Sequence, residues 1–134
     1  MSNNDLPNLF GRDLDPRLER HFAPLCIELD NLAAMELRQE IINHVEDFHK
    51  ALKYNEFLDI DTAIRIAKVL INLLDNYDSY PKSHQKLIVG AARYFVSPHD
   101  ADPDTTSLLG LDDDAAVLNY VLDTIGKPEL KIEL

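Results

Sequence analysis

Apolar residues recur at helical spacing through the middle of the chain, and this pattern constrains the fold more than any other feature. Five apolar side chains follow one another at steps of four, four, three and four: Leu37, Ile41, Val45, Phe48 and Leu52. This spacing places them on one face of an α-helix, while the charged residues between them lie mostly on other faces. We therefore expect a long helix from about residue 25 to residue 54.

Start signals mark three other helices. Asp15 is suited to cap a helix, and Pro16 after it is suited to the first helical position. A short helix should therefore run from there to about residue 22. Asp59 or Asp61 is suited to cap a helix over residues 61–77. Pro81 is expected to begin the next helix, over residues 81–95. The expected core positions of these two helices are Ile60, Ile64, Ala67, Ile71 and Leu74 in the first, and Leu87, Ile88, Ala91, Ala92 and Phe95 in the second.

The last helix is expected to begin within residues 112–114 and to end at residue 125. Three aspartates in its first turn would favour the positive end of the helix dipole. Gly126 and Pro128 follow and are typical of a helix end. The remaining tail carries alternating apolar residues that form a candidate strip for contact with a partner: Leu130, Ile132 and Leu134.

These segments predict an all-α protein, a single-domain irregular bundle of four or five helices. A chain of 134 residues suits one domain. We place the helical domain at residues 15–126, between a flexible N-terminal arm at residues 1–14 and a C-terminal tail at residues 127–134. Cys26 is the only cysteine, so no intrachain disulfide can form, and we expect it to pack in the core.

The charge of the chain limits its partners. It carries 24 acidic and 13 basic residues, a formal net charge of −11. Such a surface repels phosphate backbones, so nucleic-acid binding is not expected, and it attracts basic proteins or cations. The N-terminus lacks the pattern of a signal peptide, and residues 60–74, the most apolar window, are too short and too polar to span a membrane. We predict a cytoplasmic protein and leave its oligomeric state open.

An aspartate- and proline-rich segment separates the last two predicted helices. Its proposed motif residues are Ser97, Pro98, Asp100, Pro103, Asp104, Gly110, Asp113 and Asp114. The prolines should end the preceding helix near residue 96 and push Ser97 toward an extended conformation. The aspartates are suited to accept hydrogen bonds from backbone amides as caps, and Gly110 to adopt a positive φ. In this interpretation the segment is a structural connection between two helices.

The same eight positions resemble the signature of the YkvA-like family, small helical domains of unknown function. The resemblance consists of a Ser-Pro-x-Asp-x-x-Pro-Asp segment, a glycine six residues later and an Asp-Asp pair opening a helix. It implies a helical fold and no defined activity. Family members usually carry apolar residues at the intervening positions and many look membrane-associated. This chain has polar or small residues there, so we expect the segment to act in water: His99, Ala101, Asp102, Thr105, Thr106 and Ser107.

The aspartates also allow a second interpretation, a divalent-cation site. Asp100, Asp102 and Asp104 alternate like the first ligands of a calcium loop, but Thr105 and Leu111 stand where that loop needs glycine and glutamate. A looser oxygen-ligand site for Mg²⁺, Ca²⁺ or Mn²⁺ stays open. Its tentative ligands are Asp100, Asp104, Asp113 and Asp114. No other cofactor is predicted.

No set of residues predicts catalysis. Glu46 and His49 have the spacing of a di-iron ligand pair, but a second such pair is missing, so we interpret them as surface residues. The chain has no nucleophile elbow and no glycine-rich phosphate loop. We therefore predict a non-catalytic protein-interaction module that presents the rigid Asp/Pro-rich segment to a partner protein, and the acidic charge of the chain favours a basic one. The alternatives are a divalent-cation-binding enzyme or sensor and an immunity- or antitoxin-type protein that binds a basic toxin.

Overall fold

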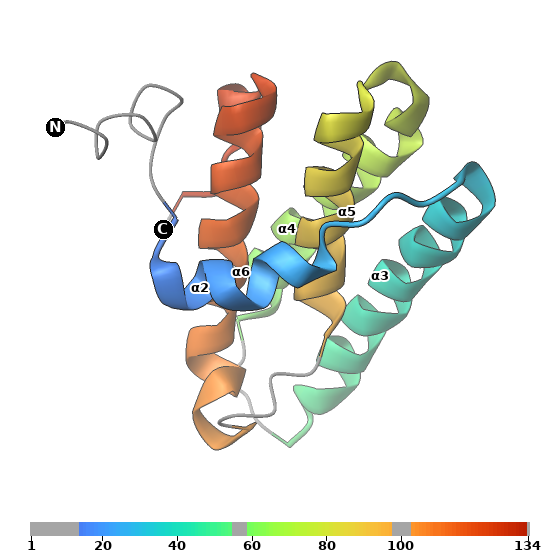
Figure 1. The fold of residues 1–134 in the computed structure, drawn as a ribbon. Coiled ribbons are helices and arrows are strands. Elements are labelled where there is room, and N and C mark those ends of the chain that lie inside the picture. Colours follow the sequence, from blue (N-terminus) through green and yellow to red (C-terminus); the bar gives the residue numbers. More distant parts are fainter. Residues whose placement is uncertain (1–13, 55–58, 98–102, 134) are drawn as a thin grey trace, which may run out of the picture.

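The chain folds into packed helices. The structure, a computed structural model, describes residues 14–54, 59–97 and 103–133, and for residues 103–110 only the backbone. Within these ranges it contains five α-helices and no strand, which confirms the predicted all-α bundle (Figure 1). The α-helices are α2 (Pro16–Phe22), α3 (Asn31–Ala51), α4 (Ile60–Asp75), α5 (Lys82–Val96) and α6 (Pro103–Ile125). Short 3₁₀ turns are η1 (Ala23–Leu25), η2 (Tyr77–Ser79) and η3 (Pro128–Leu130).

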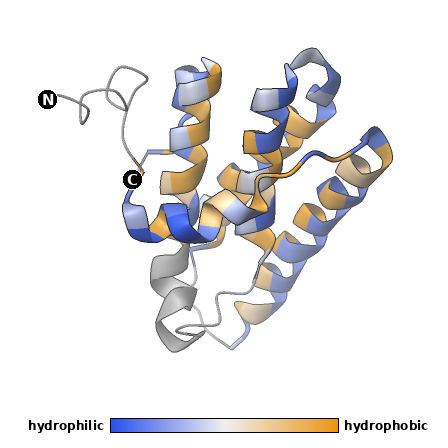
Figure 2. Cartoon of the chain, in the orientation of Figure 1, coloured by the Kyte–Doolittle hydropathy of each residue, from blue (hydrophilic) through white to orange (hydrophobic). Residues whose placement is uncertain are grey.

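The four long helices surround one core. α3 packs against α4 and α5, and α6 packs against α4 and α5. The short α2 crosses α5 and α6 and contacts both (Figure 1). Polar and apolar residues lie on different faces of α3, with the polar face outward (Figure 2). The helical periodicity of residues 37–52 therefore identified the buried face of α3 correctly: Leu37 and Ile41 are buried, and Val45 and Phe48 pack against the core.

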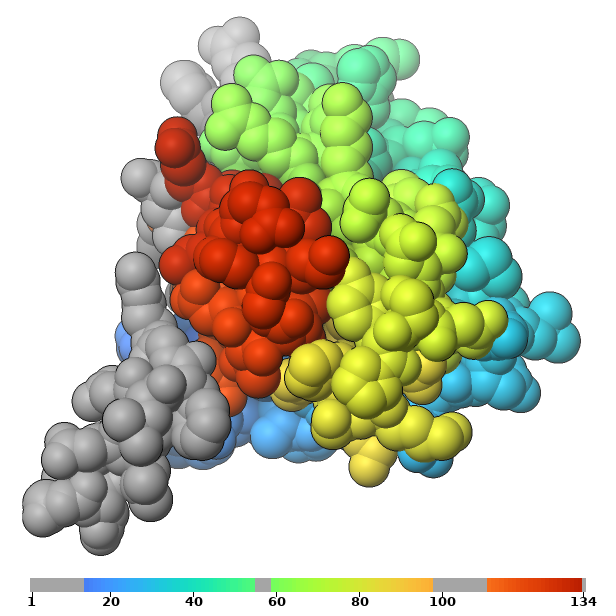
Figure 3. All heavy atoms as spheres, turned by 90° about the horizontal axis from the view of Figure 1, so that it is seen from above, coloured from blue at the N-terminus to red at the C-terminus, as the bar shows by residue number. Residues whose placement is uncertain are grey.

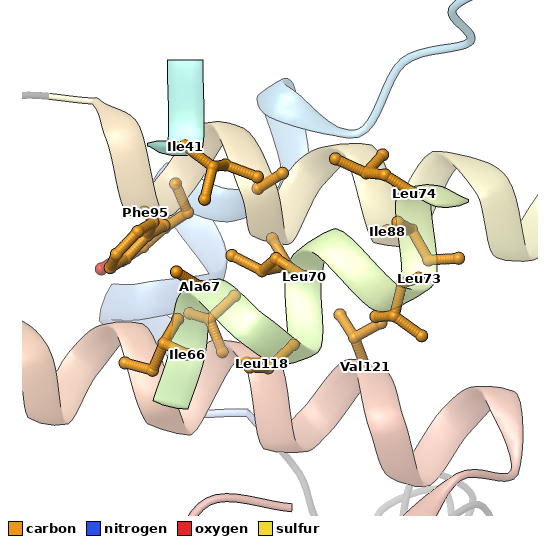
Figure 4. Close-up of a cluster of buried hydrophobic side chains, with 14 of the residues drawn as sticks. Ile41, Ile66, Ala67, Leu70, Leu73, Leu74, Ile88, Phe95, Leu118 and Val121 are labelled. Atoms are coloured by element: carbon orange, nitrogen blue, oxygen red, sulfur yellow. The ribbon is translucent and has the colours of Figure 1, made fainter. Parts of the chain in front are cut away.

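α4 is the central helix, and its buried face differs from the predicted one. Six of its residues are buried: Ala63, Ile66, Ala67, Leu70, Leu73 and Leu74. In Figure 4, Leu70 lies between Ile41 of α3, Ile88 of α5 and Leu118 of α6. Of the predicted stripe, only Ala67 and Leu74 are buried, and the three isoleucines are half-buried. The prediction of a single apolar stripe was wrong. Because neighbouring helices cover α4 on several sides, its apolar face is wider than one row of residues.

Local capping signals predicted several helix ends correctly. The Asp15 carboxylate accepts a hydrogen bond from the Arg17 amide at 2.8 Å and caps α2. The Asp59 carboxylate accepts one from the Thr62 amide at 3.1 Å and caps α4. Gly126 ends α6 with a φ of 83°, a conformation that glycine adopts without steric cost.

The expected start of the long helix at residue 25 was wrong, because α3 begins at Asn31. Asp30 caps it by accepting a hydrogen bond from the Ala33 amide at 2.8 Å. The preceding segment is held against η2: the Tyr77 hydroxyl donates to the Leu29 carbonyl at 2.9 Å and accepts from the Leu29 amide at 3.4 Å. A backbone fixed in this way cannot continue the helical hydrogen-bond ladder. A smaller correction concerns Pro81, which is the N-cap of α5 and not its first residue.

The largest correction concerns α6, which begins at Pro103 and not within residues 112–114. A proline at the first helical position costs no hydrogen bond, because a backbone amide at that position has no partner inside the helix. Asp104 then lies in the first turn, where a negative charge interacts favourably with the helix dipole. Gly110 lies inside α6, so its expected positive φ was also wrong. Asp112 and Asp113 accordingly belong to the body of the helix and cannot cap its start.

The C-terminal tail packs back on α6. Asn119 makes two hydrogen bonds to the backbone of Ile132: its Nδ2 donates to the carbonyl at 2.8 Å and its Oδ1 accepts from the amide at 2.7 Å. Lys131 Nζ lies 3.0 Å from Asp123 Oδ2. Ile132 is buried against its own chain and Leu130 is partly buried. The predicted partner strip was therefore wrong for Ile132, and Leu134 lies outside the described residues.

Candidate functional site

The eight motif residues do not form one loop. Ser97 follows α5 as its C-cap with φ −73° and ψ 138°, the extended conformation predicted from Pro98. Pro98 and Asp100 lie outside the described residues. Pro103, Asp104 and Gly110 belong to the first part of α6, where only the backbone is described. The structure therefore gives side-chain information on Ser97, Asp113 and Asp114.

Asp113 and Asp114 lie across from Tyr94, where α6 packs against α5. Tyr94 is buried, and its pKa is raised to about 12 by burial and then by the carboxylates of Asp113 and Asp114. Asp114 is only 7 % exposed and is the one charged residue among the described side chains that is buried. The charge of Asp113 also acts on Arg17 of α2, whose pKa is raised mainly by its hydrogen bond to Asp15. This part of the motif thus connects α2, α5 and α6.

The two aspartates do not face the same way. Consecutive residues of an α-helix point in directions about 100° apart, and accordingly Asp113 is exposed while Asp114 is buried. This geometry gives no support to a site in which both would ligate one ion together with Asp100 and Asp104. In the part of the chain whose side chains are described, no group of three or more His, Cys, Asp or Glu residues is arranged to hold a metal ion. The cation site therefore stays a prediction.

Cys26 lies at a close crossing between α5 and η1. Gly90 of α5 leaves room for it: a Cβ atom added at Gly90 would overlap Cys26 Sγ and the ring of Phe22. Cys26 is half-buried, and burial raises the pKa of its thiol to about 11. A thiol with so high a pKa is protonated at neutral pH and is a poor nucleophile. The packing role expected for Cys26 agrees with this position.

A groove that sequence reasoning missed lies at the end of the bundle where α3 begins and α4 ends. Its volume is about 220 Å³, and it is lined by Asn31, Ala34, Met35, Leu74, Asp75, Tyr77 and Asp78. Met35, which lines the groove, is 44 % exposed, and Leu32, one turn before it on α3 and outside the lining, is 73 % exposed. In Figure 3 the first turns of α3, in blue, lie along the edge of the face formed by η2 and the end of α4. The available signal in the sequence was that Leu32 and Met35 fall outside the apolar row that begins at Leu37.

Two carboxylates line this groove, those of Asp75 and Asp78, and others lie near Tyr77. Burial raises the pKa of the Tyr77 hydroxyl, and the carboxylates of Glu28, Asp30 and Asp78 raise it further, so these three charges lie near the buried ring. Asp78 accepts a hydrogen bond from Asn31 Nδ2 at 3.3 Å. Asp75, which lines the groove, pairs with Arg38, with 2.7 Å between Oδ1 and Nε. The groove is therefore apolar inside and acidic around its rim.

No helix among the described residues is long and apolar enough to cross a lipid bilayer. Glu46 and His49 are exposed on α3, as expected for surface residues. His44, one turn before Phe48, packs against two aromatic rings: its ring centroid lies 4.8 Å from that of Phe95 and 5.2 Å from that of Phe48. His44 is half-buried, a position that its sequence neighbours do not predict because it depends on the contact with α5.

Comparison with known proteins gives one similarity. Residues 86–120 match the model of a protein family of unknown function, DUF1232. No curated protein and no solved structure matches the chain. The matched residues run from α5 into α6 and include Tyr94, Asp113 and Asp114, so the similarity concerns this helix pair. The finer resemblance to the YkvA-like family stays a prediction, and the groove beside α3 lies outside the matched residues.

Proposed function

We propose that this chain is a non-catalytic protein-interaction module whose contact surface is the groove between α3, α4 and η2. The observation that carries the proposal is that Met35, an exposed apolar side chain, lines the groove, with the exposed Leu32 one helical turn before it. A single exposed leucine is ordinary, but neighbouring exposed apolar side chains next to a hollow with a polar rim are typical of binding surfaces. Side chains so exposed contribute little to the core, so their role is more naturally binding than folding.

The aspartate-rich segment has a different role in this proposal. Tyr94 and Asp114 are buried between α5 and α6, and a buried carboxylate is costly unless the fold compensates it. A group in this position is poorly placed to contact a partner. We therefore assign the described part of the motif to the joining of α5 and α6. The exposed Asp112 and Asp113 leave this part of the α6 surface acidic, which suits a basic partner but does not identify one.

The two alternative functions have less support. A cation-dependent enzyme or sensor would need Asp100, Asp104, Asp113 and Asp114 to converge, and the different orientations of the last two argue against it. An immunity- or antitoxin-type protein that masks a basic toxin would be a special case of the interaction module. It would use the same acidic surface, so the charge of the chain does not separate the two.

Site-specific cross-linking in cells of the source organism tests the proposal. A photoreactive amino acid replaces Leu32 in one variant and Tyr54, which is 91 % exposed near the end of α3, in a matched control. We expect a discrete adduct from position 32 only. The same adduct should disappear when Met35→Asp is added, because a carboxylate then faces the apolar groove. Equal adducts from both positions, or none from position 32, would contradict the proposal.

A further inference from the structure

We propose that the groove between α3, α4 and η2 receives a basic amphipathic helix of a partner protein, with apolar side chains in the groove and lysines or arginines against its rim. This inference rests on the interaction function proposed above and specifies the chemistry of the partner. Three observations carry it: the size of the groove, the arrangement of charge around it and the geometry of the apolar residues beside it.

The size of the groove fits side chains better than a small-molecule ligand. Ligand pockets usually measure about 300–1,000 Å³ and enclose most of the ligand. A cavity of about 150 Å³ already holds a benzene molecule. At about 220 Å³, open to solvent and lined partly by exposed residues, this groove can hold one or two large apolar side chains. It therefore suits the anchor residues of a partner segment.

The charge around the groove selects a basic segment. Glu28, Asp30 and Asp78 lie close enough to Tyr77 to raise the pKa of its hydroxyl. Asp75 adds a fourth carboxylate, which Arg38 partly neutralises. The dipoles of α4, which ends at Asp75, and of α3, which begins at Asn31, oppose each other here, so the field of the groove comes from the carboxylates. Lysine and arginine side chains placed around the apolar anchors would meet these charges.

The same charges argue against a second copy of this chain as the occupant. Each copy carries a net charge of −11, and two like-charged molecules repel each other as they approach. A dimer through this groove would also bring its acidic rim near that of the partner copy. A basic segment from another protein meets no such barrier and gains a faster encounter.

The geometry favours a helix over an extended peptide. An extended peptide is usually bound by adding a strand to an exposed sheet edge, and the described part of this chain contains no strand. Leu32 and Met35 lie three residues apart and form a short ridge on α3, of which Met35 lines the groove and Leu32 lies outside it. A helix with apolar side chains three and four residues apart can place them on both sides of such a ridge.

A designed probe tests this directly. The probe is a fluorescein-labelled peptide of about 16 residues, long enough for measurable helicity, with leucines at helical spacing and lysines elsewhere. Its dissociation constant is measured by fluorescence anisotropy against the full chain. Leu32→Ser with Met35→Ser should weaken binding at least about tenfold, a loss of about 1.4 kcal/mol. Tyr54→Ser, an exposed control just past the end of α3, should change it less than about twofold.

A second pair of variants separates local charge from net charge. Glu28→Gln with Asp78→Asn removes two rim carboxylates, and Glu46→Gln with Asp47→Asn removes two exposed carboxylates farther along α3. Both change the net charge equally. We expect about threefold or greater weakening for the rim pair only. Equal weakening by the two pairs, or equal binding of a peptide with glutamate in place of lysine, would overturn the proposal.

The result can be separated from the test of the proposed function. If position 32 gives adducts in cells but the groove variants bind the probe as tightly as the unchanged chain, the basic helix is not the occupant of the groove. The proposal of an interaction module is then still supported. Absence of those adducts would overturn both. A dimer detected by sedimentation and abolished by Leu32→Ser would make a second copy the occupant and would also overturn the basic helix.

Discussion

At the scale of single residues, Gly90 is required by the close approach of α5 to η1. Gly90→Ala adds a Cβ that would overlap Cys26 Sγ and the Phe22 ring. We expect the free energy of unfolding to fall by about 1–3 kcal/mol, the usual cost of overpacking a filled site. Urea denaturation measures the change. Cys26→Ala in the same chain removes the sulfur, so the double variant should lose less than the sum of the two single losses. Strict additivity would show that the crossing is looser than the structure indicates.

The thiol of Cys26 gives a second prediction at this scale. Burial raises its pKa from the ordinary 9.0 to about 11, so the thiolate is scarce at pH 8. We expect the rate of reaction with a chromogenic disulfide to rise about tenfold per pH unit up to pH 10, since only the thiolate reacts. The same reaction in urea should level off near the ordinary pKa. A plateau near pH 9 in the folded protein would contradict the prediction.

The raised pKa also fixes the direction of a stability change. Between pH 9 and pH 11 the folded chain keeps the thiol proton that the unfolded chain has lost. The folded state therefore binds more protons, and the free energy of unfolding falls as pH rises through this window. In Cys26→Ala this contribution should be absent, which separates it from the titration of lysines and tyrosines.

At the scale of elements, the C-terminal tail depends on one side chain of α6. Asn119 both donates to and accepts from the backbone of Ile132. Asn119→Ala should lower the free energy of unfolding by about 1–3 kcal/mol, because it leaves backbone groups of a buried residue without partners. Hydrogen exchange at the Ile132 amide should speed up as well. Asn119→Asp keeps the acceptor for that amide but places a carboxylate oxygen against the Ile132 carbonyl, so it should also lower the free energy of unfolding while slowing exchange relative to Asn119→Ala. Unchanged exchange in Asn119→Ala would show that packing alone holds the tail.

The elements also show what the sequence could and could not predict. The caps of α2 and α4 and the ends of α5 and α6 were predicted correctly, because each depends on one or two neighbouring residues such as Asp59 or Gly126. The start of α6 at Pro103 was not predicted, because a proline can either follow the end of one helix or occupy the first position of the next. The predicted core positions of α4 were partly wrong, because the buried face of this helix depends on its three neighbouring helices. The groove was missed for the same reason: its walls come from α3, α4 and η2.

At the scale of the whole molecule, folding and the proposed binding depend on different surfaces. The core lies among α3, α4, α5 and α6, and the DUF1232 match covers part of the α5 and α6 pair. Tyr94 and Asp114 join these two helices on the inside. The groove lies at the end of the bundle where α5 begins, whereas Ser97 lies where α5 ends. A partner bound in the groove would therefore leave the matched helix pair unchanged.

This separation makes a prediction about stability. Leu32→Ser with Met35→Ser should lower the free energy of unfolding by no more than about 1 kcal/mol, about 0.5 kcal/mol for each surface substitution, because Leu32 is 73 % and Met35 44 % exposed. Ile41→Ala, on the same helix but fully buried, should cost about 2–5 kcal/mol through lost burial and the cavity left behind. Urea denaturation of the three proteins measures both values. A loss near that of Ile41→Ala for the exposed pair would mean that Leu32 and Met35 hold the fold together, and the reason for assigning them to a partner would disappear.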